Sequence, residues 1–367
     1  MATFFRIQDA DRGGFGRGKA HLKPRIGETP MKTTALALAL ATLASGALAE
    51  GAGLKIAQMH MPHHDAETRV AIWYPRATGG TEAVYAENPV FRGVEAFTDA
   101  EPAAGLHPVV LFSHGMGGTD RAQAWLASAL AARGAIVVMV NHPGSTWGDH
   151  DMARGVRHWT RAADLSRALD VLTQDPDLGP HLDLTRVMAA GFSFGGWTAL
   201  SLGGVTGNLD GIVAACTAQI ETMEACDVFL SDKVGLQRQD QGLWNASYAD
   251  PRVTSVVAID PGFIWGLKAA DVVGLVPDAV LIGLGDHQTK MSATNFTESG
   301  FAALIPDAKV MQLAPAFHFT AMPLCQPKGA AILEAEQDDP VCTDPSGTDR
   351  EAVHAAIVDT IAEGLGL

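Results

Sequence analysis

Short apolar runs alternate along this chain with segments of helical spacing, and this alternation constrains the fold more than any other feature. The apolar runs lie at 109–112, 135–140, 186–192, 253–259, 279–284 and 309–313. The helical segments lie at 119–133, 160–172, 194–202 and 293–304, with a last one from about 349. Strands that alternate with helices form a mostly parallel sheet with helices on both faces. The pattern therefore predicts an α/β fold.

Three other stretches complete the expected organisation. Residues 69–74, RVAIWY, are β-branched or aromatic and end at a proline, which predicts one more strand. Residues 76–108 contain glycine, proline and glutamate and are interpreted as a long surface connection. Residues 206–250 have no sheet rhythm. We expect them to form a cap-like insertion over the carboxyl edge of the sheet, where ligands bind in such folds.

The stretch GFSFGG at 191–196 places Ser193 in a G-x-S-x-G pattern between a predicted strand and a predicted helix. This context is typical of a nucleophile elbow, a sharp turn that exposes a serine hydroxyl above the sheet. Side chains at Gly191 and Gly195 would crowd such a turn. The helix that follows points its amino end at the serine and favours developing negative charge. Ser193 is therefore the predicted nucleophile.

Ester-cleaving serine enzymes need two backbone N–H donors for the oxyanion that forms during the reaction. One donor is the residue after the nucleophile, here Phe194. The other comes from a loop after an earlier strand, and the loop SHGMGG at 113–118 has that position. The residue after its His-Gly pair is Met116, which is the predicted second donor.

The chain order of this class of site is serine, then acid, then histidine. His318 follows the predicted strand at 309–313 and is the expected general base; His287 and His354 also lie downstream. Asp260 and Asp286 each end a predicted strand, so either can orient the imidazole. We favour Asp260 and keep Asp286 as the alternative acid.

The segments FSHGMGG, GFSFGG, VVAIDPGF and AFHF, together with NHPGSTWGD and RAADLSRALDVL, resemble a known family. They are similar to secreted platelet-activating-factor acetylhydrolases and to their bacterial relatives, which are often described as predicted dienelactone hydrolases. The resemblance spans about residue 69 to the C-terminus. It implies an α/β-hydrolase fold and ester hydrolysis by a Ser–Asp–His triad, with Asp260 as the acid in the acetylhydrolase branch. True dienelactone hydrolases use cysteine where this chain has Ser193.

The N-terminal region contains an export signal that does not begin at the first residue. From Met31 the sequence MKTTALALALATLASGALAE has a positive start, an apolar core and an A-x-A-like cleavage site. We expect residues 31–49 to be a signal peptide and the protein to be secreted or periplasmic. Residues 1–30 are then interpreted as upstream translation or disorder, and residues 50–367 as a single α/β-hydrolase domain.

Composition limits the partners and the redox environment of the chain. The net charge is −15 and 18% of the residues are charged, which argues against a nucleic-acid partner. The apolar core of the signal is too short for a transmembrane anchor. Export permits disulfides, and four cysteines allow three pairings, of which we favour the sequence neighbours, Cys216 with Cys226 and Cys325 with Cys342. A zinc site is the alternative, although no CxxC or CxxH spacing supports it.

The sequence MHMPHHD at 59–65 can be interpreted in two ways. Its three histidines and one aspartate could bind a metal, but it lies between predicted strands with no further ligands evident in the sequence. A solvated turn is the favoured interpretation. Several aromatic residues lie near the motif loops, and some are expected to line an acyl pocket. They are Trp147, Trp159, Trp197, Phe263, Trp265, Phe317 and Phe319.

These features together predict an exported serine hydrolase that acts on small or medium neutral esters through an acyl-enzyme. The mechanism requires no metal or organic cofactor. Two alternatives remain: a lipase- or polyester-cleaving enzyme, and a non-catalytic binding protein on a hydrolase scaffold. The oligomeric state is not indicated by any feature of the sequence.

Overall fold

The computed structural model describes residues 51–367, so the predictions for residues 1–30 and for the signal at 31–49 lie outside the described part. Within residues 51–367, nine strands form one sheet in the order β1-β3-β2-β5-β4-β8-β9-β10-β11. The strands from β5 to β11 are parallel. A hairpin-like antiparallel region lies at the other edge.

The parallel strands form the larger part of the sheet and are largely apolar, although the last of them lies at the edge and is exposed or partly exposed at every residue. They are β5 (Ile136–Val140), β4 (His107–Ser113), β8 (Leu182–Phe192), β9 (Val253–Ile259), β10 (Asp278–Leu284) and β11 (Lys309–Leu313). All five residues of β5, IVVMV, are buried. Near-continuous apolar runs are expected where helices cover both faces of a parallel sheet. The predicted mostly parallel sheet with helices is thus confirmed.

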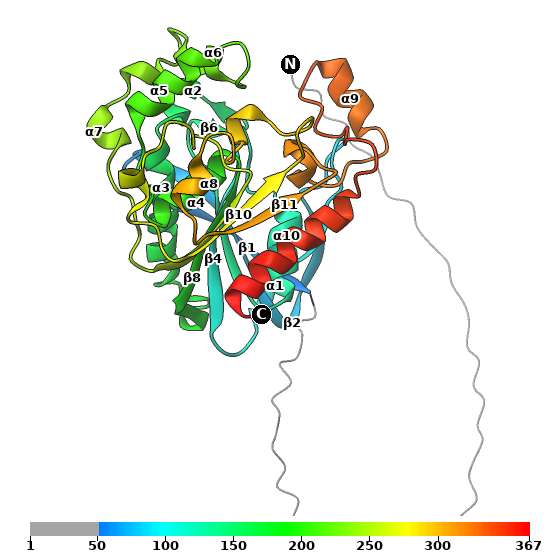
Figure 1. The fold of residues 1–367 in the computed structure, drawn as a ribbon. Coiled ribbons are helices and arrows are strands. Elements are labelled where there is room, and N and C mark those ends of the chain that lie inside the picture. The colour runs from blue at the N-terminus through cyan, green and yellow to red at the C-terminus, as the bar shows by residue number, and fades with distance from the viewer. Residues whose placement is uncertain (1–50) are drawn as a thin grey trace, which may run out of the picture. The chain divides into compact units, whose positions relative to one another are not determined.

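Helices cover the two faces of the sheet (Figure 1). On one face lie α3 (His158–Leu172) and α4 (Phe194–Leu202), and on the other α1 (Ala124–Ala132) and α10 (Arg350–Leu365). In α3 the buried leucines Leu165, Leu169 and Leu172 recur at helical spacing. Every residue of α4 is buried, because this helix lies between the sheet and α3.

The antiparallel edge differs from the sequence prediction. β1 (Ala52–Met61) pairs with β2 (Ala66–Tyr85), which continues well beyond the expected end at residue 74 and pairs with β3 (Val94–Pro102). The predicted surface connection at 76–108 is therefore wrong over most of its length. Its exposed polar residues gave no alternating apolar pattern, and backbone pairing rather than burial holds this extension together.

Two predicted helices are shorter than expected. The segment 119–133 is helical only over Ala124–Ala132, and residues 120–123 before it form turns. The segment 293–304 contains a 3₁₀ turn at Ser292–Thr294 and the one-turn helix α8 (Phe301–Leu304). Gly300, with φ 76°, precedes α8 and interrupts any longer helix. By contrast, α10 begins as predicted, and Asp349 caps it by accepting from the Ala352 N–H.

The segment 206–250 lies between α4 and β9, and its described residues contain three α-helices besides a short 3₁₀ turn at Leu236–Arg238. They are α5 (Leu209–Ala218), α6 (Cys226–Leu230) and α7 (Gln241–Trp244). The helices pack on Phe263 and Trp265, in the loop that follows β9. The insertion therefore contacts a loop at the carboxyl edge of the sheet.

The cysteines pair as expected. Cys216 bonds to Cys226, joining α5 to α6, and Cys325 bonds to Cys342. The second bond ties the loop after His318 to the segment between α9 (Gly329–Glu336) and α10. None of the helices in the part that the structure describes is both long and apolar enough to span a membrane.

Candidate active site

Ser193 occupies a sharp turn between β8, which ends at Phe192, and α4, which begins at Phe194. Its backbone has φ 58° and ψ −120°, a conformation that residues other than glycine rarely adopt. The Ser193 N–H donates to the carbonyl of Ile259 at 2.9 Å, which holds the turn against β9. The strained backbone lifts the hydroxyl above the edge of the sheet.

The two glycines of the pattern have a steric function in this turn. A Cβ on Gly191 would lie 2.2 Å from the carbonyl oxygen of Gly195. A Cβ on Gly195 would lie 1.9 Å from the carbonyl oxygen of Ser113. Both positions therefore exclude a side chain, because the backbone of α4 fills the space at Gly191 and the end of β4 fills it at Gly195.

His318 lies beside Ser193 in the described structure. It begins a 3₁₀ turn, His318–Ala321, a few residues after the end of β11. Its Nε2 lies 3.0 Å from the Ser193 Oγ, and its Nδ1 lies 2.6 Å from the Asp260 Oδ2. With Nδ1–H donating to the carboxylate, Nε2 is free to accept the serine proton.

Asp260 follows β9 and is fully buried. The Leu284 N–H and the Lys290 Nζ donate to its Oδ1, and the Thr294 hydroxyl donates to its Oδ2 at 2.8 Å. Burial acts to raise its pKa, but the hydrogen bond from His318 and the charge of Lys290 outweigh burial, and the pKa is lowered. The carboxylate is therefore held ionised.

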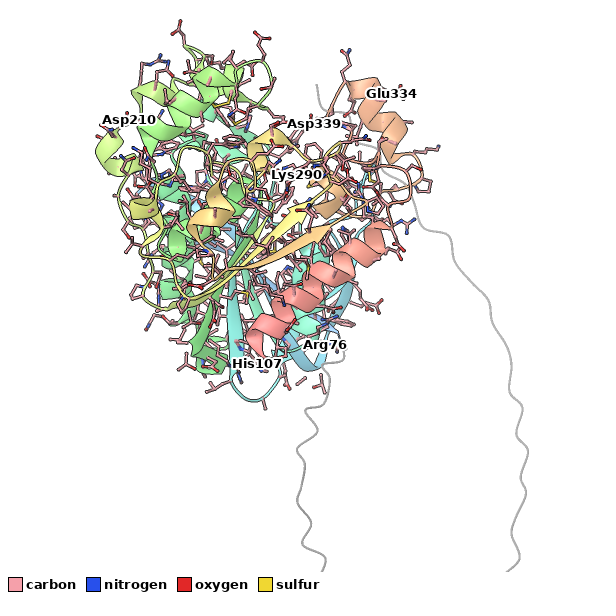
Figure 2. The ribbon with its side chains drawn as sticks, in the orientation of Figure 1. Arg76, His107, Asp210, Lys290, Glu334 and Asp339 are labelled. Carbon is pink, nitrogen blue, oxygen red and sulfur yellow. A yellow bond between two sulfur atoms is a disulfide. The ribbon has the colours of Figure 1, made fainter. Side chains whose placement is uncertain are left out.

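Lys290 is a buried cation next to this carboxylate, with 7% of its side chain exposed. It lies in the loop after β10 and is labelled in Figure 2 near the carboxyl edge of the sheet. Its other close neighbour is the ring of Phe296, with the nitrogen 5.0 Å from the ring centre. Lys290 was not predicted from the sequence, because the segment GDHQTK matches no motif.

The remaining sequence candidates lie away from Ser193. Asp286 is exposed, and its carboxylate accepts from the Gln288 N–H within its own turn. His287 is also exposed. His354 lies inside α10, is stacked on Trp125 and donates to the carbonyl of Thr320 at 2.9 Å. The geometry favours Asp260 over Asp286 as the partner of the histidine.

The loop after β4 runs beside the serine. A Cβ on Gly115 would lie 3.2 Å from the Ser193 Cβ. Across residues 51–367, neither the Met116 N–H nor the Phe194 N–H donates a hydrogen bond to another residue. An oxyanion site requires free donors close to the nucleophile, and Phe194 directly follows Ser193 while Met116 directly follows Gly115.

His114 is buried and forms a hydrogen bond that holds this loop in place. Its Nδ1–H donates to the carbonyl of Gly115 at 2.7 Å, and its Nε2 accepts from the backbone N–H of His142 at 3.2 Å. Burial lowers the pKa of His114 well below its usual value, with the charge of Arg161 adding to the effect. The ring is therefore neutral and ties the loop to the end of β5.

A second Ser–His–Asp chain lies beneath the loop. The His142 Nε2 accepts from the Ser113 hydroxyl at 2.9 Å, and its Nδ1–H donates to the Asp164 Oδ2 at 2.8 Å. These distances resemble those at Ser193, yet all three side chains are fully buried. The Ser113 Oγ also accepts from buried Arg161 at 3.0 Å. A hydroxyl without access to solvent and already fully bonded cannot attack a substrate, so this chain is structural.

Aromatic rings lie next to the candidate oxyanion donor. The ring of Phe194 lies 4.8 Å from Phe263, and Phe263 lies 5.1 Å from Phe229 of the insertion. Phe263 and Phe229 are partly exposed. By contrast, Trp197 is buried in the core and Trp147 is 73% exposed. Among the residues expected to line an acyl pocket, Phe263 therefore lies nearest to the ring of Phe194, and Phe229 is an aromatic neighbour that the sequence did not indicate.

Several supporting side chains were not predicted, although they lie in the segments that carry the family resemblance. His114 and Ser113 belong to SHGMGG, His142 to NHPGSTWGD, and Arg161 and Asp164 to RAADLSRALDVL. Residues 113–118 and 141–149 follow neighbouring parallel strands, and that adjacency is the signal that could have grouped them.

No model of a known protein family matches the sequence, and no curated protein matches it significantly. The structure is similar to the ferulic acid esterase from Streptomyces cinnamoneus, with 18% identity and a TM-score of 0.53 over 86% of this chain and 88% of that one. It also matches the dienelactone hydrolase from Anabaena variabilis, with 14% identity and a TM-score of 0.43 over 84% and 98%. The chain has the α/β-hydrolase fold, as its strand order also indicates.

Proposed function

We propose that this protein is a serine hydrolase that cleaves carboxylic esters with Ser193 as nucleophile, His318 as general base and Asp260 as the acid of the triad. The observation that carries this proposal is the continuous chain from the Ser193 Oγ to the His318 Nε2, 3.0 Å, and from the Nδ1 to the Asp260 Oδ2, 2.6 Å. The chain ends on a partly exposed serine, whereas the chain at Ser113 is buried.

The mechanism follows from this geometry. His318 removes the proton from Ser193 as the Oγ attacks the ester carbonyl. The N–H groups of Met116 and Phe194 stabilise the negative charge that develops on the carbonyl oxygen. His318 then protonates the leaving alcohol, and the acyl group remains on Ser193. Water, activated by the same histidine, releases the acid and restores the enzyme.

The proposed substrates are small or medium neutral esters. The net charge of −15 disfavours anionic substrates, and the partly exposed rings of Phe263 and Phe229 offer an apolar or aromatic wall. A structural neighbour named as a ferulic acid esterase makes an aromatic acyl group a useful member of the test series. Turnover of p-nitrophenyl esters from acetate to palmitate, together with methyl ferulate, tests this range. Peak turnover at palmitate would instead favour a lipase.

Matched variants of the two aspartates test the triad directly. Asp260→Asn preserves shape but removes the charge that orients and stabilises the imidazolium, so kcat should fall on the order of 10⁴-fold. Asp286→Asn, in an exposed turn, is the control and should keep wild-type kcat. A larger loss in Asp286→Asn than in Asp260→Asn would reverse the assignment of the acid.

Export to an oxidising compartment is part of the proposal. The bonds Cys216–Cys226 and Cys325–Cys342 are compatible with it, because disulfides persist mainly outside the cytosol. N-terminal sequencing of the secreted protein should find a mature chain that begins at residue 50. A mature chain that retains residues before Met31 would contradict this assignment.

A further inference from the structure

The turn between β1 and β2 brings two histidines to a buried carboxylate of α3. The Nε2 of His63 lies 2.7 Å from the Asp164 Oδ1, and the Nε2 of His64 lies 3.2 Å from the same oxygen. Asp164 is fully buried, whereas the side chains of His63 and His64 are 27% and 11% exposed. The segment MHMPHHD is therefore not simply a solvated turn.

The contacts of the two histidines with Asp164 leave one buried nitrogen of this cluster without a hydrogen bond. His63 is hydrogen-bonded to the carboxylate. The Nε2 of His64 is buried and has no hydrogen-bond partner in residues 51–367 despite its 3.2 Å separation from Asp164. Buried polar atoms without partners are uncommon, because each costs about 1–3 kcal/mol. A cation that accepts the lone pair of the His64 Nε2 and also contacts Asp164 and His63 would give this nitrogen a partner.

We propose that His63, His64 and Asp164 bind a divalent transition-metal ion of the zinc type. The three ligand atoms lie within 4.8 Å of one another, so one ion can contact all of them. Metal–ligand bonds of about 2.0–2.2 Å in a tetrahedral site place ligand atoms roughly 3.3–3.6 Å apart. The His63 and Asp164 atoms, now 2.7 Å apart, would separate by less than about 1 Å, and the His64 and Asp164 atoms, at 3.2 Å, are already close to this spacing. Water fills the fourth position, on the side where His63 reaches solvent.

The chemistry of the ligands selects the kind of metal. Two imidazoles and one carboxylate suit zinc and its first-row neighbours, whereas calcium and magnesium prefer sites made of oxygen atoms alone. The other carboxylate oxygen of Asp164 accepts from the Nδ1–H of His142 at 2.8 Å. This contact fixes the orientation of the ligand, as the outer hydrogen bonds of metal sites commonly do.

The bound ion would join the β1–β2 turn to α3. It would stabilise the folded chain, because an ion that binds the folded form preferentially raises its apparent stability by mass action. The site is separate from the proposed triad, since Asp164 reaches the loop of Ser113 only through His142. Ester hydrolysis therefore requires no metal at this site.

The test uses the exported chain without a histidine tag, stripped of metal. Calorimetric titration with ZnCl₂ should give one site per chain, and Co²⁺ should give the visible absorption of four-coordinate cobalt. Zinc should also raise Tm. His63→Ala and His64→Ala should each weaken zinc binding at least about tenfold and abolish the rise in Tm. Because both side chains lie in a surface turn, these variants should fold.

His60→Ala is the matched control, because His60 lies on the same hairpin with its side chain 50% exposed and contacts Glu67 rather than Asp164. It should bind zinc as the wild type does. The proposal is overturned by the absence of a saturable single site, by unchanged binding in His63→Ala and His64→Ala, or by an equal loss in His60→Ala. Esterase activity is measured separately in each variant, so a failure here does not affect the triad.

Discussion

Ser193 is the candidate nucleophile and also has a strained backbone. A pair of mutations can measure the cost of this strain separately from the loss of the hydroxyl. Both Ser193→Ala and Ser193→Gly remove the hydroxyl, but only glycine relaxes the backbone at φ 58°. Such strain costs about 1–3 kcal/mol, and glycine loses about 0.5–1 kcal/mol through chain entropy. We therefore expect Ser193→Gly to be more stable than Ser193→Ala by about 1 kcal/mol in urea unfolding. Equal stability would show that the turn is not strained.

Lys290 should be energetically coupled to Asp260. Lys290→Met leaves one oxygen of a buried carboxylate with the Leu284 N–H alone, so the free energy of unfolding should fall. In Lys290→Met/Asp260→Asn the carboxylate is also gone, and the combined loss should be smaller than the sum by about 1–3 kcal/mol. Additive losses in this double-mutant cycle would contradict the ion pair.

Motif residues and supporting residues differ in how far the sequence predicts them. Motif spacing and chain order predict Ser193 and His318, whereas they narrow the acid only to two residues, Asp260 and Asp286. Lys290 and Asp164 were not foreseen. Their positions depend on which segments meet in space, because Lys290 contacts a carboxylate thirty residues away and Asp164 contacts a turn about a hundred residues earlier in the chain.

At the level of elements, the insertion is anchored by a buried histidine at the start of α3. The Nε2–H of His158 donates to the carbonyl of Trp244 in α7 at 2.9 Å. The ring lies among the aromatic side chains of Trp159, Trp197, Trp244 and Tyr248. Burial lowers the pKa of His158 to about 4, despite the opposing hydrogen bond to Trp244.

This histidine predicts acid sensitivity of the folded chain. Its pKa is about 4 when folded and near 6.5 when unfolded, so the unfolded state binds a proton first. The stability that the neutral His158 contributes should therefore fall as the pH decreases from 6.5 to about 4, by at most about 1.4 kcal/mol per pH unit from this residue. His158→Gln keeps an N–H donor but does not titrate, and its urea stability should depend less on pH in this range. An identical pH dependence would contradict the prediction.

Strands buried on both faces were the most predictable elements, because their sequences are continuously apolar. The extension of β2 and the strand β3 were missed, since their exposed residues carry no apolar alternation. The shortening of the predicted helix at 293–304 has a local cause, because Gly300 adopts a positive φ before α8. An apolar pattern in the sequence predicts a strand or helix only where burial of its side chains, rather than backbone pairing, stabilises that element.

At the scale of the whole molecule, the parallel sheet brings the loops after β4, β8, β9 and β11 to one edge. Ser193, Asp260 and His318 are far apart in sequence and meet there, while the insertion packs on the loop after β9. The sheet thus explains how separate motifs form one candidate site.

The most direct test of this account is the site of covalent labelling by a fluorophosphonate, located by peptide mass spectrometry. We predict one adduct, on Ser193, in the wild type and none in Ser193→Ala. The variant Ser113→Ala, which removes the buried hydroxyl, should still be labelled at Ser193. A wild-type protein that forms no adduct, or forms it on another residue, would contradict the assignment of Ser193 as the nucleophile.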